Sequence, residues 1–156
     1  MRLRVILGCL LMAALSACSS APNKRVSPPA ASISELRVDS DGQWQLQLRL
    51  QNHSGMSMRF DAIELELHSG NEQIARISAQ PALSVGAESA DIHTLTLTPD
   101  AQARLLAASV LADRTALPYE LTGQVQAAAG QRKVRSYPIS HRSTLYPAPG
   151  LPGVLR

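Results

Sequence analysis

Trp44-Gln45-Leu46-Gln47-Leu48-Arg49-Leu50-Gln51 is the stretch that decides the fold, because apolar and polar side chains alternate along it without a break. Successive side chains of a β-strand point to opposite faces, so this segment is predicted to bury one face and wet the other. The wet face would carry glutamines and one arginine. The chain is therefore expected to be built from amphipathic strands.

The period of two continues on both sides of this strand. Residues 33–38 form an earlier strand of imperfect phase, and residues 39–42 read as a hairpin turn that ends in glycine. Downstream, the apolar residues of 56–60 take one phase and those of 63–67 the opposite phase. A slip of one residue would turn the apolar set to solvent, so we predict a bulge near Asp61 and Ala62.

Four later segments, 74–77, 93–97, 119–126 and 131–139, also read as strands. Between the second and third of them the period changes to that of a helix. Thr98 is expected to cap this helix and Pro99 to be its first residue. Its apolar stripe is Ala103, Leu106, Ala107, Val110 and Leu111.

These elements predict an all-β fold of about seven strands, with one helix inserted before the last hairpin. An immunoglobulin- or fibronectin-like antiparallel β-sandwich is the expected closure, and a barrel is the alternative. The 156 residues suit one domain, which we place at residues 33–146. Residues 147–156 contain three prolines and two glycines and are expected to form a loose tail.

The N-terminal residues are typical of an export signal. Arg2 and Arg4 precede an apolar run at 5–15, which is about half of the roughly 20 residues that a spanning helix needs. Residues 1–17 are therefore interpreted as a signal peptide.

The run ends in Leu15-Ser16-Ala17-Cys18, which resembles the lipobox of bacterial lipoproteins. The resemblance implies cleavage before Cys18 and acylation of its sulfur and its new amine. Serine at position 19 implies sorting to the outer membrane, with the protein facing the periplasm. Residues 18–32 would then be the lipidated cysteine and a flexible tether. Two or more acyl chains suffice for stable anchoring without a spanning helix.

The remaining side chains do not form a pattern that indicates catalysis or a cofactor. A net charge of +3 is too balanced for a dedicated nucleic-acid binder, and 3% aromatic residues leave little for a stacking platform. Glu64 and Glu66 share a strand face, which we interpret as a wet surface rather than an acid–base pair. Two sets are read as surface features, namely the histidines and a basic cluster. They are His53, His68, His93 and His141, and Arg132, Lys133, Arg135, His141 and Arg142.

The basic cluster keeps two interpretations open. Charged residues on an edge strand guard against edge-to-edge aggregation. The same residues would also suit an acidic partner or a lipid surface. The histidines lack the spacing of a zinc site, so no metal is expected.

The order of elements resembles the type 2 late embryogenesis abundant family, also called the water-stress and hypersensitive-response domain. In that family a strand ends in Asn-Pro-Asn, which is matched here by Asn52-His53-Ser54 with only the first asparagine kept. The apolar alternation of residues 63–67 and Tyr119-Glu120-Leu121-Thr122-Gly123 fit its later strands. The resemblance covers residues 33–142, and many bacterial members are lipoproteins.

Two functions follow as expectations. The resemblance implies a non-catalytic domain in water-stress or envelope protection, acting through weak contacts with envelope proteins. The alternative is an adaptor that docks one specific envelope protein through a strand edge. Asn52 is expected to shape the turn after its strand, because asparagine bonds nearby backbone and tolerates left-handed φ. No enzyme activity, nucleic acid or small-molecule substrate is expected.

Overall fold

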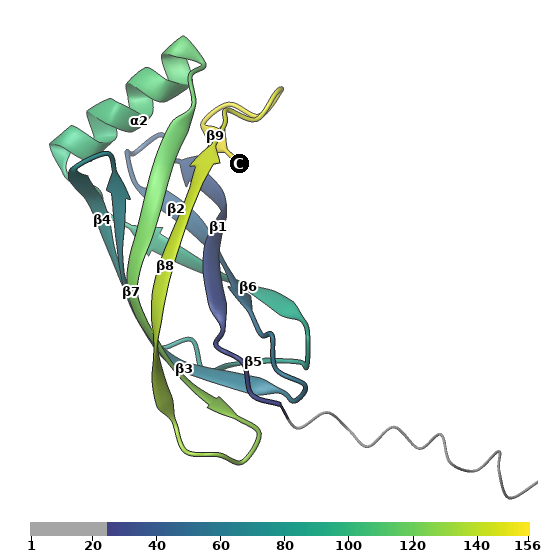
Figure 1. Ribbon diagram of the computed structural model, residues 1–156. Coiled ribbons are helices and arrows are strands. Elements are labelled where there is room, and N and C mark those ends of the chain that lie inside the picture. Colours follow the sequence, from purple (N-terminus) through teal and green to yellow (C-terminus); the bar gives the residue numbers. More distant parts are fainter. Residues whose placement is uncertain (1–24) are drawn as a thin grey trace, which may run out of the picture.

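The computed structural model describes residues 25–156, and two antiparallel β-sheets make up most of this part (Figure 1). The expected all-β sandwich is confirmed. The first sheet has the order β6-β2-β1-β9, formed by Ala90–Leu97, Trp44–Gln51, Ala30–Val38 and Val154–Leu155. The second has the order β4-β3-β7-β8, formed by Glu72–Ala79, Met58–Ser69, Leu117–Ala129 and Arg135–Leu145; β5, Leu83–Val85, pairs with β3.

The core lies between the sheets and follows the predicted alternation. Every apolar residue of β2, from Trp44 to Leu50, is completely buried, while Gln45 and Arg49 between them are exposed. In β3 the pairing with β7 shifts between Phe60 and Ala62, which confirms the predicted bulge. This shift lets the apolar residues on both sides of it face the same core.

The imperfect phase of the first strand also has a structural cause. The register of β1 on β2 shifts between Ile33 and Glu35, so that Ile33 and Leu36 both turn inward although three positions separate them. Beside this bulge, the Ile33 N–H donates to the Tyr119 hydroxyl at 3.1 Å. Burial raises the pKa of Tyr119, so that side chain stays a neutral hydroxyl that bridges the two sheets.

The strand boundaries differ from expectation mainly at the C-terminal side. The last long strand was expected at 131–139, whereas β8 spans Arg135–Leu145 and pairs with β7 along its whole length. Its period is weak in sequence because only Ile139 and Leu145 are buried in it. Strands β5 and β9 are too short to produce a period at all.

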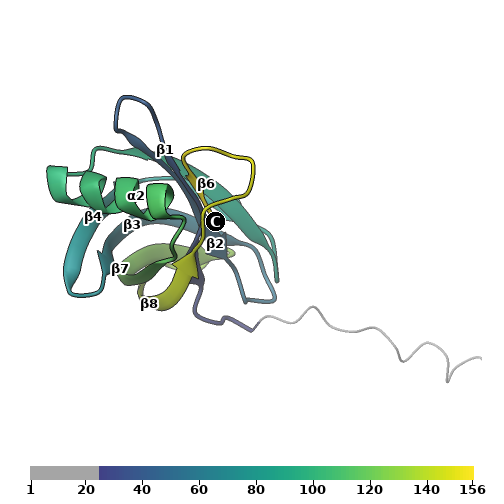
Figure 2. The same cartoon turned by 90° about the horizontal axis from the view of Figure 1, so that it is seen from above.

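Helix α2, Ala101–Asp113, lies across one end of the sandwich (Figures 1 and 2). Its cap is Asp100 rather than Thr98, because the Asp100 carboxylate accepts the N–H of Ala103 at 2.8 Å. Aspartate caps at least as well as threonine and carries a charge that suits the helix dipole. Of the predicted apolar stripe, Ala103, Ala107 and Val110 are buried, and Leu106 and Leu111 are partly buried.

The C-terminal residues are not a loose tail. Val154 and Leu155 are buried and form β9 against β1, and the Val38 N–H donates to the Gly153 carbonyl at 2.8 Å. Arg156 then reaches Glu35, with its Nη2 2.7 Å from the carboxylate. Glu35 is 5% exposed and also meets Arg37 at 3.3 Å, so two guanidinium groups compensate its burial.

The Glu35 contact makes stability depend on pH. Hydrogen bonding to Arg156 holds the pKa of Glu35 below its usual value of 4.5. A lowered carboxyl pKa contributes stability above the unfolded value and loses it as the pH falls through the folded value. We expect Arg156→Gln to lower the free energy of unfolding at pH 7 by about 1 kcal/mol, since the guanidinium is half exposed. The deficit should shrink below about pH 4.5.

Urea unfolding at pH 7 and pH 3.5 would measure this difference. Arg142→Gln is the matched control, because Arg142 pairs with Glu120 at 3.0 Å on the surface with 79% of its side chain exposed. A surface pair of this kind contributes little at either pH. A deficit for Arg156→Gln that is equally large in acid would contradict the role assigned to Glu35.

Candidate functional site

The loop after β2 is organised by one buried amide. The Asn52 side chain is fully buried, and its Nδ2 donates to the carbonyls of Met56, Gly86 and Val85 at 2.8, 2.7 and 3.2 Å. Its Oδ1 accepts the N–H of Ser54 at 2.8 Å. One side chain therefore ties the loop that follows β2 to the loop that follows β5.

Ser54 binds the chain that enters the domain. It is fully buried; its Oγ accepts the Ser27 N–H at 3.0 Å and donates to the Ser27 carbonyl at 3.1 Å. The Gly55 N–H donates to the Arg25 carbonyl at 3.0 Å. Residues 25–32, expected to be tether, are thus held against the domain, and β1 already begins at Ala30. His53, between the two buried residues, is exposed.

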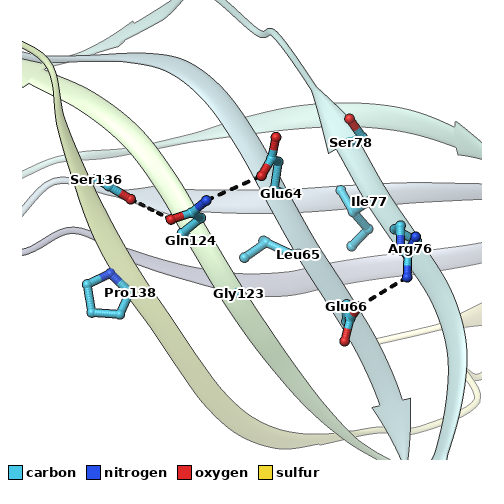
Figure 3. Close-up of a pocket in the computed structure, with 10 residues that line it drawn as sticks. All are labelled: Glu64, Leu65, Glu66, Arg76, Ile77, Ser78, Gly123, Gln124, Ser136 and Pro138. Carbon is cyan, nitrogen blue, oxygen red and sulfur yellow. Dashed lines mark hydrogen bonds and ion pairs between the residues drawn. The ribbon is translucent and has the colours of Figure 1, made fainter.

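The outer face of the second sheet carries a shallow open groove of about 700 Å³ across β4, β3, β7 and β8 (Figure 3). Ser136 Oγ donates to Gln124 at 2.7 Å, and Gln124 Nε2 donates to Glu64 at 3.3 Å. Two residues further along β3, the Glu66 carboxylate lies 3.3 Å from the guanidinium of Arg76. Each carboxylate has its own partner, and the two are not arranged as an acid–base pair.

Gly123 forms part of the floor of this groove, at the position where β7 pairs with Leu65 of β3. Its φ is +136°, and a Cβ there would lie 2.3 Å from the Glu64 carbonyl oxygen. Only glycine allows the two backbones this approach. The Tyr-x-Leu-x-Gly pattern thus has a physical reason at both ends, since Tyr119 bridges the two sheets and Gly123 lets β7 approach its neighbour β3 within one sheet.

The outer face of the first sheet is polar as well. Gln45 pairs in register with Thr96, and Gln47 with Thr94, so amides and hydroxyls stand side by side. Together with Arg49 they form what we call the glutamine–threonine face. Three of these five residues lie on β2 and two on β6, and all have access to solvent. This face offers many hydrogen-bonding groups and no deep cavity.

The histidines lie apart from one another. His68 contacts Glu66 at 3.4 Å, His141 packs against the Tyr119 ring with 6.0 Å between centroids, and His93 pairs with Leu48. Within residues 25–156, no group of three histidine, cysteine or acidic side chains is placed to hold a metal ion. Nor does this part of the chain contain a helix long and apolar enough to span a bilayer.

The basic cluster is divided by the fold. Arg132 and Lys133 lie in the turn between β7 and β8, and Arg135 opens β8. Arg142 lies seven positions after Arg135 and pairs with Glu120. The predicted lipidation and sorting residues, Leu15-Ser16-Ala17-Cys18-Ser19, lie outside the described residues and remain predictions.

Sequence reasoning missed three buried or long-range contacts, those of Ser54, Glu35 and Arg156, that hold the two ends of the domain together. Ser54 stands where the family motif has its second asparagine, which was the available signal for its burial. Glu35 and Arg156 gave no local signal, because their contact joins positions 121 residues apart.

The family model described as late embryogenesis abundant protein (LEA_2) matches residues 47–143, which is more than half of the chain. The chain belongs to the type 2 late embryogenesis abundant family. No curated protein sequence matches it.

The chain is similar to three solved structures, of which the first shares its fold. The solution structure of AT1g01470 from Arabidopsis thaliana aligns with a TM-score of 0.57 at 17% identity, covering 84% of this chain and 89% of that one. The solution structure of the late embryogenesis abundant (LEA) protein At2g46140.1 has a TM-score of 0.48 at 16% identity, covering 97% and 86%. A crystal structure of an Archaeoglobus fulgidus protein has a TM-score of 0.45 at 12% identity, covering 80% and 98%.

Replacing Asn52 tests the loop assignment. Asn52→Ala would strip three carbonyls and one N–H of their partner in a buried place, and each such group costs about 1–3 kcal/mol. Because water would satisfy some of them, we expect a loss of about 2–4 kcal/mol in the free energy of unfolding. Urea denaturation measures it, and His53→Ala is the adjacent control, expected within about 0.5 kcal/mol of wild type. Equal losses in both variants would show that the amide does not organise the loop.

Proposed function

We propose that this protein is a non-catalytic lipoprotein of the outer membrane whose type 2 late embryogenesis abundant domain protects envelope proteins during water stress. The observation that carries the proposal is the family match over residues 47–143, since members of this family are generally non-enzymatic. Anchoring rests on Cys18 within its lipobox-like sequence. Attachment would be to the periplasmic side of the membrane.

The polar faces support protection through weak contacts. On the second sheet the groove residues already bond one another, so a visiting protein would exchange these bonds rather than meet unpaired charges. On the first sheet the glutamine–threonine face presents amides and hydroxyls that both donate and accept. Such surfaces hold many partners loosely and none tightly, because association has to exceed a large entropic cost.

The adaptor function is the alternative. It needs a strand edge that a partner can lengthen. The edge strand β6 of the first sheet contacts β4 and β5 of the second, and the edge strand β8 of the second contacts β1 of the first. The two sheets therefore approach each other along both edges. This closure favours the protective function. Stoichiometric capture of one envelope protein by cross-linking in cells would instead favour the adaptor.

Anchoring is tested by lipid labelling in a bacterium with two membranes. We expect the tagged chain to take up radiolabelled palmitate and to fractionate with the outer membrane. Cys18→Ala should lose both, because the acyl chains are attached to that residue. The control is Cys9→Ala, which removes the other cysteine from the predicted signal peptide. Unlabelled wild-type protein would refute the anchoring.

Protection is tested by drying a reporter enzyme with the purified chain from residue 18 onward. We expect more activity to survive than with an equal mass of albumin. Replacing Gln45, Thr94 and Thr96 by alanine should lower the protection at least twofold, since it removes hydrogen-bonding groups from one face. The matched control replaces the exposed polar residues Ser40, Gln80 and Thr115. Protection no better than that of albumin would reject the protective function.

A further inference from the structure

We propose that the turn between β7 and β8, residues 130–135, binds the head groups of anionic phospholipids and seats the domain on the membrane by this end. This inference rests on the anchoring proposed above. The contact would be made by Arg132, Lys133 and Arg135, with the side chain of Val134 between them.

The chain enters the domain at the same end as this turn. The Gly130 N–H donates to the Ser57 carbonyl at 2.8 Å, and the loop that contains Ser57 also holds Arg25 and Ser27 through Gly55 and Ser54. Figure 1 shows the start of the described chain beside the β7–β8 hairpin, with α2 at the opposite end. Whatever anchors residue 18 therefore holds this end nearest to the membrane.

The distance from the anchor is short. Arg25 is seven positions after Cys18, and a fully extended chain covers at most about 3.6 Å per position, or roughly 25 Å in total. The 13-residue strand β7 alone is longer, because strands rise about 3.4 Å per residue. The turn at 130–135 thus lies within reach of the lipid surface, whereas α2 is held away from it.

The entry end of the domain is mainly basic and the far end mainly acidic, which is the difference that binding to anionic lipid requires. The entry end carries Arg25, Arg59, Arg132, Lys133 and Arg135 against Asp61, Glu88 and Asp91, and Arg59 and Asp61 pair with each other. The far end carries Asp39, Asp41, Glu72, Asp100 and Asp113 against Arg104 and Arg114, besides Glu35 with its partners Arg37 and Arg156. A negatively charged surface would attract the first end and repel the second.

The turn itself has the composition of an interfacial contact. Val134 is an apolar side chain that is 46% exposed. Basic residues flank it on both sides, and long basic side chains place their stems in an apolar layer while their charges meet phosphates. Cations that protect an edge strand against aggregation would lie along β8, but Arg142 on that strand is paired with Glu120. The position of the cations at the tip favours head-group contact.

The test measures how closely each end approaches the bilayer, independently of natural acylation. The chain from residue 18 includes every residue that the structure describes. With Cys18→Ala and an N-terminal hexahistidine tag, it is held on vesicles by a nickel-chelating lipid. A dye on Val134→Cys or, as the control at the far end, on Leu105→Cys reports quenching by a labelled lipid; Leu105 is 72% exposed on α2.

With 30% phosphatidylglycerol, roughly the anionic content of a bacterial membrane, we expect severalfold stronger quenching at position 134 than at position 105. In pure phosphatidylcholine and at about 0.5 M salt, the difference should fall to the smaller value that the N-terminal attachment alone produces. On anionic vesicles without the nickel-chelating lipid, Lys133→Gln with Arg135→Gln should weaken binding about 10- to 30-fold, whereas Arg49→Gln with Arg114→Asn should not. Equal quenching at both positions, or quenching that ignores the anionic lipid, would overturn the proposal even if Cys18 is acylated.

Discussion

The apolar side chains of β2 are completely buried, and they stay dry only while a second sheet covers them. Removing about 25 cal/mol per Å² of apolar surface from water is the main favourable contribution to folding, so this single face requires a partner layer. The partner is β3 with β7, whose strands approach closely because Gly123 has no side chain. The bulges in β1 and β3 then keep the remaining apolar residues in phase with that layer.

The two ends of the sandwich are held by different chemistry. At the entry end, neutral hydrogen bonds of Asn52 and Ser54 join three loops that are distant in sequence. At the far end, Arg156 reaches the buried Glu35 and holds the last strand in place. Buried neutral amides keep their partners at any pH, whereas a buried ion pair depends on ionisation. The end that receives the chain is therefore the one that is insensitive to acid.

The docking of residues 25–27 on the domain changes how a lipid-anchored domain would be oriented on the membrane. A tether running to residue 32 would leave the domain free to turn in all directions. Because residues 25–27 are hydrogen bonded to the loop after β2, the segment between the domain and the proposed anchor would be much shorter, and this end of the domain would be held toward the anchor. Under the proposed anchoring, the two polar faces would stand roughly upright, where proteins of the envelope would contact them.

The sequence by itself determined which residues face the core, where β3 bulges and where the helix lies, because these depend on periods of 2 and 3.6 within a few residues. It also determined the family, through Asn52 and the pattern from Tyr119 to Gly123. Only the tertiary structure decided the short strands β5 and β9, the burial of Ser54 and Glu35, and the docked C-terminus. Those features depend on partners 23 to 121 positions away, and a local sequence pattern holds no information on contacts between residues so distant in the chain.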